Sequence, residues 1–468
     1  MASIVNQFLK NARRATNRQP LFSVVIPTRN RAHLLPYALR SALAQDFDDY
    51  EIVVVANDCR DNTREVVRSF SNNCIAYYET EQMLTMPENW EFAWTKARGK
   101  YVTYLPDDDA LVPSALRRLA EHALHGDPEV VSWEDATYCY PDWNDERMQN
   151  TMLLFNFGDT LVEDVPVEVY RQQCARFEFA WSSPVPKMLN TAVHRDFFEG
   201  WRQKLGKLFF PIAPDYSFAW IATTVCANIR VLHRPLTVRG ISFNSAGSNA
   251  GLTPAGEAFY QEFGDFDFFA ETQIPLPTTI NHLAATFLRI NAKFREIGIE
   301  PESLNQERFI YVAAQQFKEF QAYIPDWSSH VPHLLKAAEK VSPTLRDEVN
   351  AILSAPVPEK AEVETLRELR SRTAQMALEY PPNLELKKSE HLGDVQCARC
   401  LLGLNEAVLA DANWNYLYIF GEVLGASDPY AMCLQVDRYY DLLRKCAKKQ
   451  EQGAAATAIS SATRTESR

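Results

Sequence analysis

The chain has 468 residues, enough for two or three domains of ordinary size. Hydrophobic residues make up 46% and charged residues 23%, a balance typical of a folded globular protein, so disorder over the whole chain is excluded. The net charge of −12 argues against a nucleic-acid-binding protein, which would present a basic surface, so we expect no nucleic-acid partner.

The ends of the chain and its cysteines bear on where the protein resides. Residues 1–20 predict a short basic helix that is frayed or docked on the protein, with weak contact to a membrane surface as the alternative. No apolar stretch approaches the roughly 20 residues of a membrane-spanning helix, and the start lacks a signal-peptide core. Nine cysteines at irregular spacings indicate reduced thiols, so we expect a cytoplasmic protein, with the inner face of the membrane as one site of action.

Strand and helix patterns alternate from residue 21. Short apolar runs predict strands at 22–26, 51–55, 75–79 and 101–105. Apolar residues at helical spacing follow each strand, and Gly99 is expected to cap the third of these helices. This rhythm is typical of a parallel sheet with both faces covered by helices.

The pattern changes twice further along the chain. Residues 129–250 mix strand runs with aromatic segments, and we assign them to the same domain, which spans 21–253. Residues 254–450 predict a mainly helical C-terminal domain, and residues 451–468 predict a disordered tail. Helical patterns occupy 306–324, 342–355, 360–380 and 428–449. The pair Cys397 and Cys400 lacks a second pair at zinc-site spacing, so we expect these residues to pack within a helix.

Three polar segments each follow a predicted strand: PTRNR (27–31), NDCRDNT (57–63) and PDDD (106–109). Because ligands bind outside the carboxyl ends of parallel strands, we expect these segments to meet at one crevice. Three adjacent carboxylates need a counter-charge, and Mg²⁺ or Mn²⁺ bound together with a phosphorylated substrate can supply it. A solvated acidic loop or a helix N-terminus is the alternative interpretation.

Four segments occur in the order of a known family: SVVIPTRNR (23–31), EIVVVANDCRDNT (51–63), MPENWEFAWTKARGKYVTYLPDDDALVP (86–113) and FPIAPDYSFAW (210–220). On these segments, residues 20–250 resemble the family 2 glycosyltransferases, which use nucleotide-sugar donors. The resemblance implies the α/β GT-A fold, a Rossmann-like and mostly parallel sheet with helices on both faces. No family is assigned to the helical remainder.

The resemblance also implies a nucleotide site at the strand ends. Pro27 and Thr28 would border the nucleoside, while Asn57 or Asp58, with Asp61 nearby, would face the base and ribose. Carboxylate and amide groups can bond a base N–H or a ribose hydroxyl. The full set assigned to the nucleotide is Pro27, Thr28, Asn30, Arg31, Asn57, Asp58, Arg98, Asp107 and Asp108.

The family's metal motif is aspartate, any residue, aspartate. In this chain the ligand pair is either Asp107 with Asp109 or Asp108 with Asp109, so Asp109 is a direct ligand in both registers. Lys96 and Arg98 can neutralise phosphate or lie on a solvated helix face. Mn²⁺ or Mg²⁺ is the expected cofactor.

A base must accept the proton of the acceptor hydroxyl. The resemblance implies Asp215 for this role, with helix capping as the alternative and Glu134 or Asp135 as substitutes. Three further residues are assigned more weakly to the acceptor side: Trp181, Ser182 and His233, with Ser183 adjacent. An aromatic ring can stack on a sugar but can equally fill a core, and His233 can approach the metal or phosphates or serve a structural purpose.

The resemblance therefore implies an inverting, metal-dependent glycosyltransferase. Its donor would be a UDP-, GDP- or dTDP-sugar, and its acceptor a glycan or lipid-linked sugar. A nucleotidyltransferase is an alternative, although PTRNR is not the glycine-rich basic segment that such enzymes carry after the first strand. A non-catalytic sugar-nucleotide-binding or scaffold protein is the other.

Overall fold

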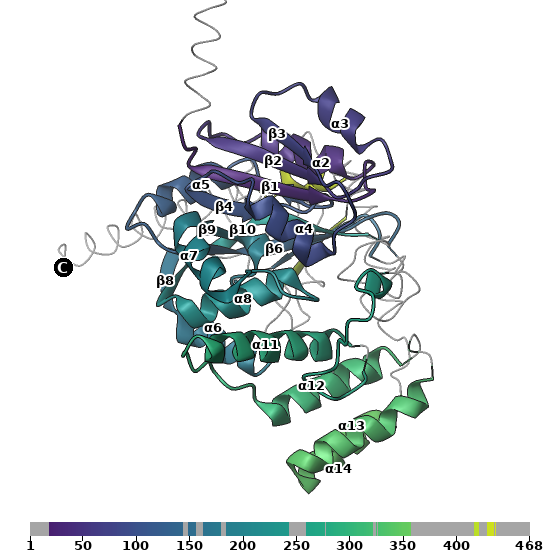
Figure 1. Ribbon diagram of the computed structural model, residues 1–468. Coiled ribbons are helices and arrows are strands. Elements are labelled where there is room, and N and C mark those ends of the chain that lie inside the picture. Colours follow the sequence, from purple (N-terminus) through teal and green to yellow (C-terminus); the bar gives the residue numbers. More distant parts are fainter. Residues whose placement is uncertain are drawn as a thin grey trace, which may run out of the picture.

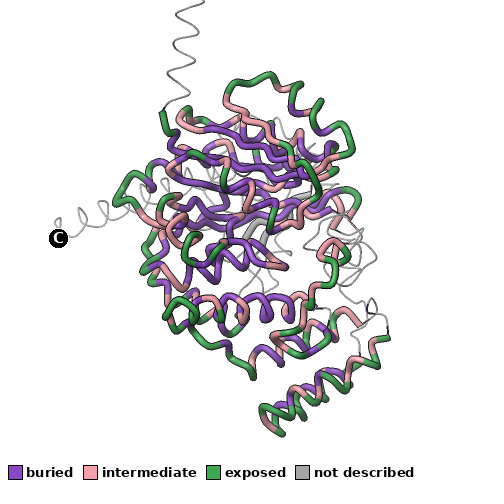
Figure 2. The backbone as a smooth tube through the Cα atoms, in the orientation of Figure 1, coloured by how far each residue is buried: buried purple, intermediate pink, exposed green. Residues whose placement is uncertain are grey.

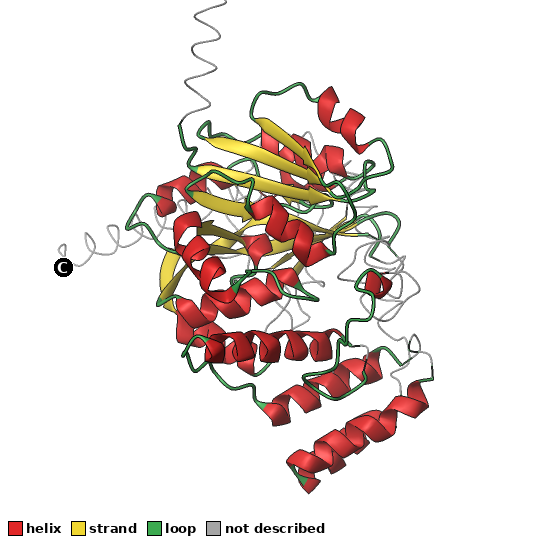
Figure 3. Cartoon of the chain, in the orientation of Figure 1, coloured by secondary structure: helices red, strands yellow, loops and turns green. Residues whose placement is uncertain are grey.

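The structure is a computed structural model. It describes residues 18–143, 148–155, 162–178, 184–242, 259–276, 278–321, 324, 326–356, 416–420, 428–434 and 436. Within this part of the chain, 11 strands form one sheet, and helices lie on both sides of it (Figure 3).

The first half of the sheet is parallel. It consists of four strands in the spatial order β3, β2, β1, β4: β1 Phe22–Thr28, β2 Tyr50–Ala56, β3 Ile75–Glu79 and β4 Tyr101–Tyr104. These are the four strands predicted from the apolar runs. Since the strands run in the same direction, their C-terminal ends lie along one edge of the sheet.

The second half of the sheet is mixed. Strand β9 is antiparallel to both β4 and β6, and so joins the two halves, whereas β10 runs parallel to β6. The remaining pairs, β5 and β8 with β10, β7 with β6, and β11 with β7, are antiparallel. The bounds are β5 Ala110–Leu111, β6 Val130–Cys139, β7 Thr151–Phe155, β8 Val162–Pro166, β9 Thr191–His194, β10 Asn228–Ile241 and β11 Tyr416–Phe420.

Alternation along the strands builds a core on each face of the sheet. Val24 and Ile26 of β1 pack with α2, α3 and α5, while Val25 faces the opposite core, which holds α4, α6, α7 and α8. The helix bounds are α2 Leu35–Leu43, α3 Thr63–Ser69, α4 Met86–Trp94, α5 Ala115–Ala123, α6 Val167–Ala175, α7 Arg195–Leu205 and α8 Pro214–Val225; a short 3₁₀ turn, η1, spans Met188–Asn190. The predicted α/β class is confirmed.

One local prediction was wrong. Helix α4 ends at Trp94, so Gly99 does not cap it. A Cβ at Gly99 would lie 2.4 Å from the backbone nitrogen of Ser23. Glycine is needed there because the chain passes against the start of β1.

The predicted helical C-terminal region is also present. Helices α11 Thr279–Glu296, α12 Gln306–Glu319, α13 Trp327–Val341 and α14 Pro343–Ser354 lie beneath α8, with α13 and α14 farthest from the sheet (Figure 1). Trp220 of α8 stacks on Phe287 of α11, with ring centroids 4.7 Å apart. Figure 2 shows exposure increasing toward the outer pair of helices.

Two of these helices, α11 and α13, were not predicted. Several polar residues of α11, among them Asn281, His282 and Asn291, are buried and interrupt the apolar stripe that periodicity detects. By contrast α14 begins as predicted, since the Ser342 side chain accepts a hydrogen bond from the Leu345 N–H. Residues 429–434 are helical, as expected for the start of 428–449. The predictions for 1–17, 360–380, the Cys397–Cys400 pair and 451–468 lie outside the described residues.

Candidate active site

The ends of β1 and β4 are joined by buried side chains. Thr28, the last residue of β1, donates from Oγ1 to Asp107 Oδ2 over 2.6 Å. Arg31, in the loop after β1, donates from Nη1 to Asp107 Oδ1 at 3.0 Å and to Asp108 Oδ2 at 2.9 Å. Two of the three polar segments therefore meet, as the strand order requires.

The segment after β2 joins them through backbone contacts. The Asn57 N–H donates to the Thr28 carbonyl at 2.9 Å, and the Ala32 N–H donates to Asp61 Oδ2 at 2.9 Å. Asp61 also accepts from the Thr63 hydroxyl at 2.6 Å, which places it at the start of α3. The expected convergence of all three segments is confirmed.

The two residues predicted to face the nucleotide base differ in how many contacts their side chains already make within the protein. Both ends of the Asn57 amide bond the backbone of Leu84, so this side chain holds two loops together. Asp58 is partly exposed, has a left-handed backbone with φ 45°, and pairs with Arg60. Of the two alternatives for a polar group facing a bound base or ribose, the structure thus leaves Asp58 the more accessible.

The loop after β1 is shaped by similar contacts. Asn30 has φ 53° and its side-chain oxygen accepts from the Arg60 N–H at 2.7 Å. Pro27 is buried within β1, opposite Val55 of β2. Neither residue contacts the acidic segment in these bonds, and the side chains that bond the acidic residues come from Thr28 and Arg31.

The acidic segment is buried, and neighbouring charges act on its carboxylates. Asp107, Asp108 and Asp109 are 4%, 6% and 2% exposed. Burial raises the pKa of Asp107 against the opposing charge of Arg31, and burial together with the charge of Asp108 raises the pKa of Asp109 well above its usual range. Burial opposes the charged form of Arg31, but Asp108 and Asp107 outweigh this and raise its pKa. Arg31 therefore supplies part of the counter-charge that the sequence alone assigned to a cation.

Gly240 of β10 and Tyr140, the residue after β6, both donate hydrogen bonds to the acidic segment. The Gly240 N–H donates to Asp109 Oδ1 at 2.8 Å, and the Tyr140 hydroxyl donates to the Asp108 carbonyl oxygen at 3.0 Å. A Cβ at residue 240 would lie 1.9 Å from that carbonyl oxygen, so only glycine permits this approach. Sequence reasoning missed both residues, because a glycine and a tyrosine in strand patterns give no signal of what they oppose.

Asp215 lies in the first turn of α8, directly after Pro214. Burial raises the pKa of Asp215, while the charges of Lys187 and Arg239 and hydrogen bonds from the helix-start backbone oppose the rise. Ala213 holds the N-cap position of α8, so Asp215 lies in the first turn without being the N-cap of the alternative interpretation. The structure also places the carboxylate in the field of two cations.

Lys187 and Arg239 connect Asp215 with the acidic segment. Lys187 Nζ lies 3.4 Å from Asp135 Oδ2, and both residues are 2% exposed. The charges of Asp135 and Arg239 also act on Asp109. Acidic and basic side chains therefore alternate between the acidic segment and the start of α8. Each of the two cations is a single basic residue in an otherwise apolar or strand-like stretch, which is a weak sequence signal.

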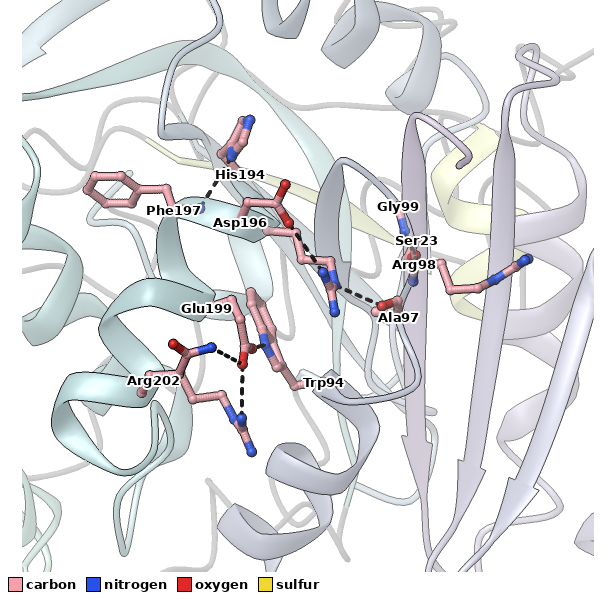
Figure 4. A network of polar contacts seen from close by, with 12 residues as sticks. Ser23, Trp94, Ala97, Arg98, Gly99, His194, Asp196, Phe197, Glu199 and Arg202 are labelled. Carbon is pink, nitrogen blue, oxygen red and sulfur yellow. Dashed lines mark hydrogen bonds and ion pairs between the residues drawn. The ribbon is translucent and has the colours of Figure 1, made fainter. Parts of the chain in front are cut away.

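Arg98 was assigned to the nucleotide, but the structure places its guanidinium in an ion pair with Glu51, away from the acidic segment. Its guanidinium donates to Glu51 Oε2 at 2.6 and 2.9 Å, and its backbone N–H donates to the Ser23 hydroxyl at 3.1 Å. Ser23 and Glu51 are near the starts of β1 and β2, so Arg98 lies at the edge of the sheet opposite the acidic segment. Figure 4 shows Arg98 beside Ser23. Lys96 lies over the ring of Phe92, 4.3 Å from its centroid.

His233 does not approach the acidic segment either. Its Nδ1 lies 3.1 Å from Glu134 Oε1 and its Nε2 lies 2.7 Å from Glu163 Oε1. It precedes Gly240 by seven residues on β10, roughly 20 Å at the usual rise of a strand. Glu134, a substitute base, belongs to this separate cluster, whereas Asp135 does not. Trp181, Ser182 and Ser183 lie outside the described residues.

The acidic segment offers oxygen ligands of the kind that Mn²⁺ and Mg²⁺ prefer. From the described residues, the Asp109 carboxylate receives a hydrogen bond on Oδ1 only, and burial with a like charge nearby disfavours its ionised form. A cation would remove that penalty, so the residues fit such an ion. No group of three or more His, Cys, Asp or Glu side chains in the described part is arranged to hold a metal by itself. Mg²⁺ commonly binds through one or two carboxylates plus substrate phosphates.

Comparisons with known proteins agree with this geometry. A sequence model of glycosyl transferase family 2 matches residues 23–181. The GalNAc(5)-diNAcBac-PP-undecaprenol beta-1,3-glucosyltransferase of Campylobacter jejuni is 36% identical over 110 residues, which cover 23% of this chain and 36% of that protein. The UDP-Glc:alpha-D-GlcNAc-diphosphoundecaprenol beta-1,3-glucosyltransferase WfgD of Escherichia coli is 28% identical over 96 residues, covering 20% and 38%. The matched segments thus span less than half of these curated relatives.

Among solved structures, residues 1–349 of S. aureus TarS in complex with UDP-GlcNAc are 18% identical, with a TM-score of 0.42. That match covers 71% of this chain and 90% of the TarS chain. The family match carries the assignment, because it includes the three segments that meet at the crevice. Residues 23–181 of this chain therefore resemble glycosyl transferase family 2.

Proposed function

We propose that the chain is a glycosyltransferase that moves a sugar from a nucleotide diphosphate to an acceptor hydroxyl. The observation that carries this proposal is the buried contact of Thr28 and Arg31 with Asp107 and Asp108. It places the acidic segment at the C-terminal edge of the parallel strands, where α/β sheets bind their ligands. The family match supports the same conclusion.

The donor's diphosphate is proposed to lie at the acidic segment. Asp107, Asp108 and Asp109 would hold Mn²⁺ or Mg²⁺ together with donor phosphate oxygens. Bound there, the cation supplies stabilisation of the negative charge on the departing diphosphate. The crevice wall is formed by the loops after β1 and β2, from which Asp58 would reach the nucleoside.

Asp215 is proposed as the general base. Its carboxylate would take the proton from the acceptor hydroxyl while that oxygen forms a bond to the anomeric carbon and the bond from this carbon to the diphosphate breaks. A single in-line displacement of this kind inverts the anomeric centre. Lys187 and Arg239 favour the ionised carboxylate, the form that accepts a proton.

The names of two relatives suggest the acceptor. Both proteins are named for sugars linked to undecaprenol through a diphosphate, so we propose a lipid-linked sugar or related glycan as acceptor and peripheral contact with the membrane that carries it. Among the described helices, none is both long enough and apolar enough to pass through a bilayer. UDP-sugars are the first donors to test, followed by GDP- and dTDP-sugars.

The test is release of nucleoside diphosphate from a panel of nucleotide sugars, with and without Mn²⁺ and undecaprenyl-diphosphate-linked sugars. We expect one donor to be turned over, and Asp109→Asn to abolish turnover although the amide oxygen can still accept from Gly240. Asp215→Asn should bind the donor with unchanged affinity but lose transfer. Donor binding without turnover under all conditions would instead identify a non-catalytic sugar-nucleotide-binding protein, and wild-type turnover in Asp215→Asn would remove Asp215 from the mechanism.

A further inference from the structure

Arg31 binds two of the three carboxylates that a cation at the acidic segment would use. One nitrogen, Nη1, donates to carboxylates of both Asp107 and Asp108. The side chains of these aspartates are 5% and 9% exposed, and that of Arg31 is 18% exposed. The guanidinium and the two carboxylates are therefore buried together.

Arg31 and a dication compete for the same oxygens. Both Asp107 oxygens already accept hydrogen bonds, one from Thr28 and one from Arg31. A metal ion that coordinated Asp107 Oδ1 or Asp108 Oδ2 would stand against the positively charged guanidinium. Removing Arg31 from a buried carboxylate pair without replacing its charge is unfavourable, and binding a second cation beside it is unfavourable as well.

If a cation displaces Arg31 from the two carboxylates, the released guanidinium needs a new anionic partner. The described residues provide no ready-made group of three metal-binding side chains, so the cation requires oxygen ligands from elsewhere. In the proposed reaction the donor's diphosphate brings those oxygens to the loop that carries Arg31. A guanidinium binds phosphate oxygens with two parallel hydrogen bonds as readily as it binds a carboxylate.

We propose that Arg31 is an exchanged counter-ion that couples cation binding to donor binding. In the free protein it neutralises Asp107 and Asp108, and it transfers to the donor's diphosphate when the cation takes its place. The cation alone then binds weakly, because it must displace Arg31 from two buried carboxylates. This inference rests on the proposed function, since it assumes that a nucleotide diphosphate and a cation meet at the acidic segment.

The experiment measures Mn²⁺ binding from the electron paramagnetic resonance signal of the free ion. The full chain is titrated alone, with UDP, and with uridine, which lacks the diphosphate. In the wild type we expect UDP to raise the Mn²⁺ affinity by about fivefold or more, a typical size for coupling between two sites, and uridine to have no effect. Linkage requires Mn²⁺ to raise the affinity for UDP by the same factor, which calorimetry checks.

The variants separate Arg31 from the rest of the site. Arg31→Ala should bind Mn²⁺ alone about fivefold or more tightly than the wild type, and the effect of UDP on that affinity should shrink by a similar factor. Arg31→Lys, which keeps the charge but loses the planar fork, should lie between the two. Arg117→Ala is the matched control: this arginine also pairs with a carboxylate, that of Asp46, but on α5 and outside the site, and its loss should change neither affinity.

The outcomes distinguish this inference from the function on which it rests. Unchanged Mn²⁺ affinity and unchanged coupling in folded Arg31→Ala would overturn the role of Arg31 while leaving the glycosyltransferase proposal intact. Equal effects of UDP and uridine in the wild type would overturn the role of Arg31 without use of any variant. Failure of the wild type to bind Mn²⁺ in the presence of either UDP or a donor that it turns over would refute the metal site itself.

Discussion

Gly240→Ala tests whether β10 positions the acidic segment. The added Cβ would lie 1.9 Å from the Asp108 carbonyl oxygen and 2.6 Å from Tyr140 Cε2, whereas real Cβ contacts essentially never fall below 3.0 Å. The backbone of Asp108 must therefore move by at least 1.1 Å, the difference between 3.0 and 1.9 Å. The tyrosine ring must shift as well, and the hydrogen bond from the Gly240 N–H to Asp109 is strained.

The size of the effect follows from that displacement. Overpacking of a well-packed core costs about 1–3 kcal/mol of unfolding free energy. A displacement of about 1 Å at a reacting centre can lower the rate about 100-fold. We therefore expect Gly240→Ala to lose about 1–3 kcal/mol of stability and about two orders of magnitude in turnover of the donor.

Urea denaturation measures the stability, and release of nucleoside diphosphate measures the turnover. Gly200→Ala is the control, because a Cβ at this position in α7 meets no atom within 4 Å. Alanine there should stabilise the helix by about 0.5–1 kcal/mol and leave turnover unchanged. If Gly240→Ala kept both wild-type stability and wild-type turnover, β10 would not position the acidic segment.

Three further predictions concern charges. Arg98→Ala should leave the affinity for UDP and Mn²⁺ unchanged while destabilising the edge of the sheet at Glu51; weaker UDP binding, measured by calorimetry, would restore Arg98 to the nucleotide site. His282 is buried, and burial lowers its pKa from 6.5 to about 4, so below pH 6.5 the unfolded chain binds a proton that the folded chain does not. The unfolding free energy should therefore fall by about 3 kcal/mol between pH 6.5 and 4, and His282→Asn should show a flatter dependence in urea titrations at each pH. Lys187→Met leaves the buried Asp135 carboxylate without its ion-pair partner and should cost about 3–5 kcal/mol, with Lys187→Arg milder. Lys187→Met should also move the acidic limb of the pH–rate profile to higher pH, because the Lys187 charge lowers the pKa of Asp215. An unmoved limb would show that Lys187 does not act on the catalytic carboxylate.

Much of the candidate site could be predicted because its main parts follow strands. Thr28 and Asp107 are far apart in sequence, yet Thr28 ends one parallel strand and Asp107 follows another, and parallel strands place their C-terminal ends at one edge. The same logic could not place Arg98. Helix α4 leads back to the start of β4, so a basic residue between that helix and β4 lies at the other edge, beside Glu51.

The residues that sequence reasoning missed are those whose partners come from distant parts of the chain. Gly240 opposes Asp108 only because β10 pairs with β5, and Lys187 is buried against Asp135 only because the turn η1 packs between sheet and helix. Buried polar residues concealed α11 for a related reason: they are satisfied by tertiary contacts, such as the Trp220 indole N–H donating to Asn291. Local periodicity cannot anticipate such partners.

By itself the sequence determined the alternation of strands and helices, and with it the edge at which the polar segments meet. Hydrophobic periodicity and the shared direction of parallel strands suffice for that conclusion. Only the tertiary structure decided which charge neutralises which. Arg31 pairs with Asp107 and Asp108, and Lys187 pairs with Asp135, because burial removes water as a competing partner and each buried charge must be matched by the side chain that packing brings within reach.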